Sequence, residues 1–178
     1  QEGGIAIADV LFGDFNPAGR LPFSVPRSVG QIPLYYNKKA PQSHDYVEMS
    51  ASPLYPFGYG LSYTSFDYSD LHLSALMPRS FEISFKVRNT GKYDGEEVAQ
   101  LYLRDEYASV VQPLKQLKHF ARFYLKRGEE REVKFILSEE DFSLVDRNLK
   151  KIVEPGTFQI MIGAASNDIR LQTKVEIK

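Results

Sequence analysis

Apolar and polar residues alternate along much of the chain after Phe66. The clearest case is 81–88, where polar residues separate Phe81, Ile83, Phe85 and Val87. A period of two places alternate side chains on opposite faces, so this run predicts a half-buried strand. Similar runs or extended apolar stretches occupy 66–76, 99–103, 120–125, 133–137, 158–162 and 171–177.

Turn signals separate most of these predicted strands: Asn89-Thr90-Gly91, Asp94-Gly95, Arg127-Gly128 and Pro155-Gly156. About seven strands over about 110 residues are typical of an antiparallel β-sandwich of the immunoglobulin or fibronectin type III kind. The expected fold class is therefore mainly β. Ser138 and Asp141 have the spacing of a capping box and predict one helical turn, a structural use of its carboxylates.

The opening segment, 1–52, has a different pattern. Helical spacing of Ile5, Ala8, Leu11 and Phe12 predicts a short helix that ends near Gly13. A loop and a short extended piece at 21–26 follow, and no clear period continues to Ser52. Such a segment cannot build its own core. We expect 1–52 to be a truncated segment that needs a partner surface, with apolar residues that either associate with another copy or leave the segment disordered.

Residues 53–65 form a connector between the two regions. Prolines and glycines exclude a regular helix from this stretch, and its aromatic content is too high for a flexible linker. We expect a rigid, packed connector whose rings contact the β-sandwich of 66–178 on one side. The other side should face a surface that is only partly present in this chain.

Composition excludes several kinds of chemistry. The 178 residues carry a net charge of −1, so no overall attraction to nucleic acid or anionic membranes is expected. Cysteine is absent, which removes disulfides, thiol nucleophiles and zinc–thiolate sites. No apolar run approaches the roughly 20 residues that span a bilayer. The chain begins at Gln1 without methionine, which suggests processing or a piece of a longer protein.

The candidate chemical groups are sparse. His44, His72 and His119 are too far apart in sequence to suggest a metal site, and the adjacent Ser43-His44-Asp45 cannot face one another as a triad. The basic residues between Lys115 and Arg131 are interpreted as a solvated face rather than a nucleic-acid patch. Glu2 precedes a helix start, where capping is favoured over a functional role.

One loop contains residue types that are typical of sugar-binding sites. Asp45 and Glu48 lie near several tyrosines in the sequence, and carboxylates with aromatic rings are typical of sugar sites; the tyrosines are Tyr35, Tyr36, Tyr46 and Tyr55. The alternative, that the rings pack between domains and the acids are solvated, is favoured.

Long stretches of the chain resemble the carboxy-terminal part of glycoside hydrolase family 3, the β-glucosidases, β-xylosidases and relatives. These stretches are QEGG at 1–4, ADVLFGD at 8–14, NPAGRLP at 16–22 and PLYPFGYGLSYT at 53–64. The β region resembles the family's fibronectin type III-like domain, in Asn89-Thr90-Gly91, Asp94-Gly95, 98–103 and Glu154-Pro155-Gly156.

The resemblance implies that 1–52 are the C-terminal remnant of the family's α/β sandwich domain and a linking loop. It also implies a barrel domain and the rest of the α/β domain upstream, which hold the nucleophilic aspartate and the acid/base glutamate of a retaining glycosidase. No stretch here matches either motif, so no catalytic, cofactor or metal residue is assigned. The expected function is a non-catalytic bracing fragment of a periplasmic or secreted β-glycosidase, most simply a β-glucosidase that cleaves terminal sugars from oligosaccharides. Its expected partners are the missing domains of the same protein. The alternatives are a carbohydrate-binding or adhesion module and a scaffold without ligand.

Overall fold

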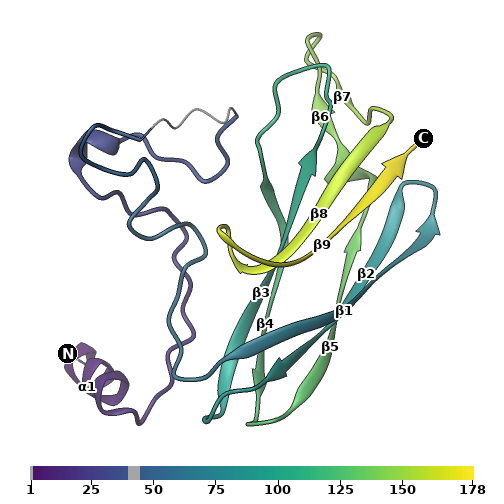
Figure 1. Ribbon diagram of the computed structural model, residues 1–178. Coiled ribbons are helices and arrows are strands. Elements are labelled where there is room, and N and C mark those ends of the chain that lie inside the picture. Colours follow the sequence, from purple (N-terminus) through teal and green to yellow (C-terminus); the bar gives the residue numbers. More distant parts are fainter. Residues whose placement is uncertain (1, 40–44) are drawn as a thin grey trace.

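Two antiparallel sheets pack face to face, and the amino-terminal segment lies along one side of them (Figure 1). The computed structural model describes residues 2–39 and 45–178. One sheet has the order β1-β2-β5, from Phe66–Met77, Ser80–Asn89 and Glu130–Leu137. The other has the order β4-β3-β8-β9, from Gln116–Leu125, Gly95–Asp105, Gly156–Ala165 and Asp168–Ile177. The predicted β-sandwich is confirmed.

The core lies between the sheets and follows from the alternation. The register pairs Ile83 with Phe135 and Phe85 with Val133, so the apolar residues of β2 and β5 share the inner face. Residues from both sheets form one buried cluster, including Phe85, Leu101, Phe142 and Ile160. The opposite face of β2 and β5 carries an exposed cross-strand ion pair, Lys134 with Glu82 at 3.2 Å.

The short elements complete the sandwich. A 3-10 helix, η2 (Glu139–Phe142), forms where the helical turn was predicted, and the Ser138 N–H donates to the Asp141 carboxylate at 2.9 Å. The pair β6 (Leu144–Val145) and β7 (Lys151–Ile152) was not predicted, because two residues are too few to show a period. No helix in the described ranges is long and apolar enough to cross a membrane.

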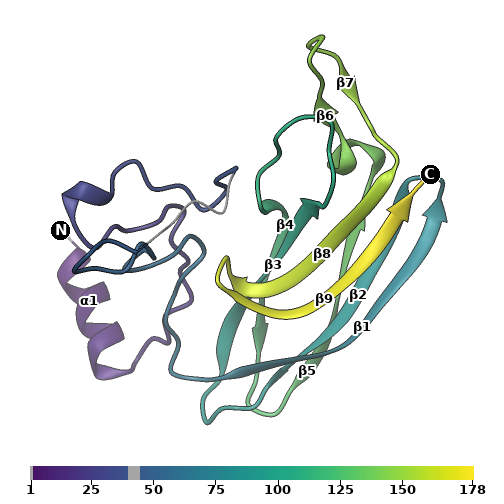
Figure 2. The same ribbon diagram turned by 45° about the horizontal axis from the view of Figure 1, so that its top comes forward.

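Strand β3 is longer than its alternation predicted, because most of it is buried on both faces. Its inner residues, such as Ala99 and Leu101, face the core, while the amino-terminal segment covers the outward Gln100 and Tyr102. Figure 2 shows this segment beside the sheet that contains β3 and β8. The segment therefore adds a third layer to one sheet.

The amino-terminal segment contains α1 (Gly3–Phe12) and η1 (Val29–Gln31). Helix α1 ends as predicted at Gly13, whose φ of 88° is the left-handed conformation that glycine adopts readily. The extended piece at 21–26 pairs with the connector through a bridge between Val25 and Tyr55. None of the residues of α1 is buried, and its Phe12 is 84% exposed.

Candidate functional site: the joint between the amino-terminal segment and the sandwich

A buried ion pair joins the amino-terminal segment to β3. The Arg20 guanidinium donates to the Glu97 carboxylate at 2.9 Å, and the side chains are 11% and 4% exposed. Glu97 shares the inward period of β3 with Ala99 and Leu101, so its charge is placed among apolar residues. The same carboxylate oxygen also accepts from the Val98 N–H at 2.8 Å. The pair locks the loop that contains Arg20 to the end of the sandwich.

Asn16 links three segments. Its amide nitrogen donates to the Asp94 carbonyl at 2.9 Å, and its amide oxygen accepts from the Tyr63 N–H at 2.8 Å and the Ser62 hydroxyl at 3.1 Å. Asp94 lies in the β2–β3 turn, whereas Ser62 and Tyr63 end the connector. One side chain therefore fixes the loop, the connector and the turn relative to one another.

Asn89 performs a similar task inside the sandwich. It is fully buried at the end of β2, and its amide nitrogen donates to the carbonyls of Tyr93 and Leu125. Its amide oxygen accepts from the Thr64 hydroxyl at 2.6 Å and the Gly91 N–H at 3.1 Å. Both donors and the acceptor oxygen of the amide are used, so this buried polar group is satisfied.

The connector packs on the outer face of β3 as expected. Phe57 stacks on Tyr36 with ring centroids 4.0 Å apart, and Tyr36 meets the buried Tyr102 edge-on. The Gln100 amide nitrogen donates to the Gly58 carbonyl at 3.2 Å. Gly58 has a φ of +80°, and a Cβ there would collide with the Gln100 amide, so glycine is required for the close approach.

Asp94 gives this joint a dependence on pH. Hydrogen bonds from the Arg127 N–H and then the Tyr124 hydroxyl hold the pKa of the Asp94 carboxyl below its ordinary value of 3.8. A carboxyl with a lowered pKa adds stability above its unfolded pKa, and that stability is lost as the pH falls through the folded pKa.

We expect Asp94→Asn to weaken the fall in melting temperature between about pH 5 and pH 2, because the residue no longer takes up a proton on unfolding. Circular dichroism melts across this range measure the effect. Asp67→Asn, at an exposed position of β1, is the matched control. If the melting temperature of the Asp94 variant fell as much at acid pH as that of the unmodified chain, this role would be contradicted.

The structure separates the residues of the proposed sugar loop. Tyr36 is used in packing, and its hydroxyl accepts from the Leu117 N–H at 3.2 Å. The Asp45 carboxylate caps its own loop by accepting from the Ala51 N–H at 2.8 Å, whereas Glu48 is exposed. Tyr35 and Tyr46 are also exposed, and Tyr55 packs on Tyr59. Tyr36 therefore packs as the favoured interpretation expects, and Tyr55 packs within the connector. For the exposed Tyr35 and Tyr46, packing between domains stays a prediction.

Glu2 and the histidines were the remaining candidates for a functional role. Glu2 stands at the N-cap of α1, but its side chain makes no cap hydrogen bond, so the capping interpretation was wrong. His119 lies 3.5 Å from the Asp141 carboxylate, His72 is exposed on β1, and Ser43 and His44 lie outside the described residues. Among the described residues no group of three or more His, Asp or Glu side chains could hold a metal ion.

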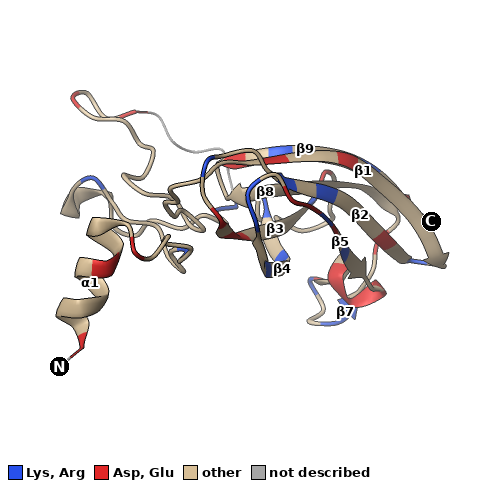
Figure 3. Cartoon of the chain, turned by 90° about the horizontal axis from the view of Figure 1, so that it is seen from below, with Lys and Arg blue, Asp and Glu red and all other residues tan. Residues whose placement is uncertain are grey.

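The predicted basic stretch is dispersed over its neighbours. Arg122 pairs with Glu96, Arg131 lies over the Phe123 ring, and the Lys115 ammonium donates to the Ser166 carbonyl. Figure 3 shows basic and acidic residues interspersed over the strands rather than gathered by sign. The arrangement supports the interpretation as a solvated face.

Sequence reasoning missed the joint residues Arg20, Glu97 and Gln100. One signal was available: Glu97 lies on the same face of β3 as Ala99 and Leu101, where a charge needs a partner. The partner itself lies 77 residues away in sequence. Local patterns contain no information on that pairing.

The fold and the joint define a class: an immunoglobulin-like β-sandwich with a short preceding segment held against it. Residues 1–63 match the glycosyl hydrolase family 3 C-terminal domain, and residues 97–166 match the fibronectin type III-like domain. The chain belongs to glycoside hydrolase family 3 and corresponds to the carboxy-terminal part of its β-glucosidases.

Individual relatives agree with this assignment. A periplasmic β-glucosidase of Salmonella typhimurium is 46% identical over 95% of this chain and 24% of its own length. A β-xylosidase of Formosa agariphila is 45% identical over 96% of this chain and 24% of its own length. A solved β-glucosidase structure from Erythrobacter marinus has a TM-score of 0.92 at 42% identity, over 99% of this chain and 24% of that one. The chain thus spans about a quarter of the length of these relatives.

Proposed function

We propose that this chain is the non-catalytic bracing part of a retaining β-glycosidase, most simply a β-glucosidase that removes terminal β-linked sugars from oligosaccharides. The observation that carries the proposal is the asymmetry of the amino-terminal segment. One side is locked to the sandwich by the buried Arg20–Glu97 pair, while the other side leaves Leu11 and Phe12 bare on α1. A bare apolar face next to a rigid joint suits a segment that supports another domain.

The chemistry itself is assigned to the upstream domains. Retaining hydrolysis needs two carboxyl groups about 5–5.5 Å apart on either side of the scissile bond. The buried acid described above, Glu97, is neutralised by Arg20, and the Asp45 and Asp141 carboxylates hold local turns. We assign none of them to catalysis. Metal and cofactor sites are likewise not assigned to this chain.

We also propose that the chain consists of three parts. Residues 1–52 are the end of an α/β domain and its linking loop, 53–65 are the connector, and 66–178 are the sandwich. The match of 1–63 to the family's C-terminal domain supports the first part. The hydrogen bonds from the Gln100 side chain to the Gly58 carbonyl and from the Ser166 N–H to the Phe57 carbonyl support a connector that packs on the sandwich.

The cellular location is proposed from a relative. The Salmonella typhimurium protein, 46% identical to this chain, is named a periplasmic β-glucosidase. We propose that this protein also acts in the periplasm or outside the cell, where oligosaccharides are available. Fractionation of cells that produce the complete polypeptide, followed by immunodetection, tests this location.

The purified 178-residue chain is expected to release no nitrophenol from aryl β-glucosides or β-xylosides, because the catalytic carboxylates lie elsewhere. The assay is colorimetric, with the complete polypeptide as the positive control. Turnover by the chain that disappears in Glu2→Gln would overturn the non-catalytic assignment. A complete polypeptide that hydrolyses neither substrate would overturn the glycosidase proposal.

A further inference from the structure

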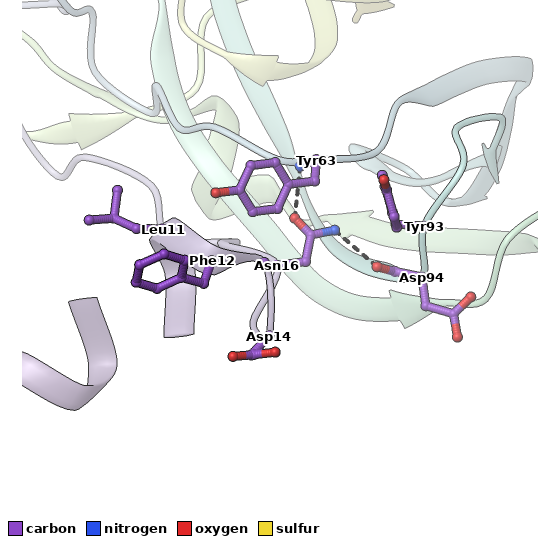
Figure 4. Close-up of a pocket in the computed structure, with 8 residues that line it drawn as sticks. Leu11, Phe12, Asp14, Asn16, Tyr63, Tyr93 and Asp94 are labelled. Carbon is purple, nitrogen blue, oxygen red and sulfur yellow. Dashed lines mark hydrogen bonds between the residues drawn. The ribbon is translucent and has the colours of Figure 1, made fainter. Parts of the chain in front are cut away.

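A hollow of about 530 Å³ lies between the end of α1 and the β2–β3 turn (Figure 4). Leu11 and Phe12 of α1 form one wall, and Tyr93 of the turn forms the opposite wall. Asn16 and Tyr63 lie between them. The hollow therefore spans the boundary between the amino-terminal segment and the sandwich.

The walls of the hollow are held in place. Asn16 donates to the Asp94 carbonyl of the turn and accepts from the Tyr63 N–H. The Tyr63 hydroxyl donates to the Val10 carbonyl of α1 at 2.6 Å. Helix, connector and turn are thus joined around the hollow, so an occupant would meet a preformed shape rather than a loop that must first be ordered.

Most of the polar groups around the hollow already have partners within the chain. Both ends of the Asn16 amide and the Tyr63 hydroxyl have partners, and the Asp94 carboxylate accepts from Tyr124 and Arg127. A sugar would need free donors and acceptors for its hydroxyls. Apart from the Asp14 carboxylate, the hollow offers an aliphatic side chain and aromatic rings: Leu11 is 73% exposed, and the rings of Phe12, Tyr63 and Tyr93 are also exposed.

We propose that this hollow is the socket for an apolar segment of the upstream domains of the same polypeptide. The inference rests on the proposed bracing function and adds a direct contact from the sandwich, through Tyr93, to the catalytic part. Leu11 and Phe12 belong both to the bare face of α1 and to the hollow, so a domain that covers this face reaches the hollow as well. Aromatic residues around a preformed recess are typical of the centre of an interface.

The charge around the C-terminal end of α1 indicates which kind of residue should flank the inserted apolar segment. Helix α1 has no basic residue in its last turn, so the negative end of its dipole is not compensated within the helix. The exposed Asp14 follows directly, and its carboxylate points away from the rings at the rim (Figure 4). The inserted apolar side chains are therefore expected to be flanked by a lysine or an arginine that meets this rim.

Site-specific photocrosslinking in the complete polypeptide tests the socket. The photoreactive amino acid p-benzoylphenylalanine replaces Tyr93, and in separate variants it replaces Phe12 or Val145. After irradiation, mass spectrometry identifies the captured peptide. We expect positions 93 and 12 to capture peptides upstream of this chain, with a basic residue near the site captured from 93. Position 145, on β6, should capture none.

The outcomes separate this inference from the bracing function. Capture of upstream peptides from position 12 but not from 93 overturns the socket and leaves the bracing function standing. Absence of upstream capture from both positions overturns both. Capture of a second copy from position 93 makes the hollow an interface between copies and overturns the inference. Capture from position 93 that is lost in excess glucose or xylose identifies a sugar site and also overturns the inference.

Discussion

Replacing Arg20 with alanine is expected to lower the free energy of unfolding of this chain by about 3–5 kcal/mol. The Glu97 carboxylate, which is 4% exposed in the intact chain, would lose its charged partner, and the Val98 N–H alone cannot compensate a buried charge. Urea titration followed by circular dichroism measures the change. A loss of this size corresponds to a fall in melting temperature of about 6–20 °C for a chain of this length.

Two further variants test whether the loss of stability in Arg20→Ala comes from the buried ion pair. Lys134→Ala breaks the exposed pair with Glu82 and should cost at most about 1 kcal/mol, since exposed ion pairs contribute little. The double variant Arg20→Met with Glu97→Leu removes both charges and should recover most of the loss. Equal effects of Arg20→Ala and Lys134→Ala would show that burial does not set the strength of the joint.

Asn89→Ala is the second substitution with a large expected effect, a loss of about 3–5 kcal/mol in the free energy of unfolding. It removes the partner of the Tyr93 and Leu125 carbonyls and of the Thr64 hydroxyl at a fully buried position. Each buried group left without a hydrogen bond costs about 1–3 kcal/mol. The measurement is again a chemical denaturation curve.

The matched control for Asn89 is Asn37→Ala, at an exposed position of the amino-terminal segment, with an expected change within about 0.5 kcal/mol. Thr64→Val, which keeps the shape but removes one hydroxyl, should have an intermediate effect. If Asn89→Ala behaved like the exposed control, the network would not contribute to folding stability.

Both substitutions act on the joint, and this has a consequence for the proposed function. Arg20 holds the amino-terminal segment, and Asn89 holds Thr64 at the end of the connector. A brace must transmit position without bending, and satisfied buried polar contacts rigidify a joint more specifically than apolar packing does. Function and folding stability are therefore expected to fail together when the joint is weakened.

Much of the fold could be predicted from the sequence because strand formation depends mainly on local sequence patterns. The alternation in 81–88 places Ile83 and Phe85 on one face, and that face is the one buried in β2. Gly13 ends α1 where the helical pattern stops. The capping box at Ser138 also depends only on a spacing of three residues.

The joint could be predicted only in part. The aromatic connector indicated a packed segment, and Phe57 is indeed stacked on a neighbour. The sequence did not identify that neighbour as Tyr36, although packing between domains was the favoured interpretation for Tyr36. The reason is that the residues around position 36 suggest a polar loop, whereas the Tyr36 ring packs against Tyr102 on β3.

By itself, the sequence determined the strands, the faces that they bury and the positions of the turns, since these follow from periods of two and from the backbone preferences of glycine and proline. The tertiary structure alone decided which polar residues meet. Arg20 and Glu97 are 77 residues apart, and Asn16 and Asp94 are 78 apart. Their contacts depend on the way the amino-terminal segment lies across β3. A local pattern can mark Glu97 as needing a partner, but only the packing of distant segments supplies Arg20.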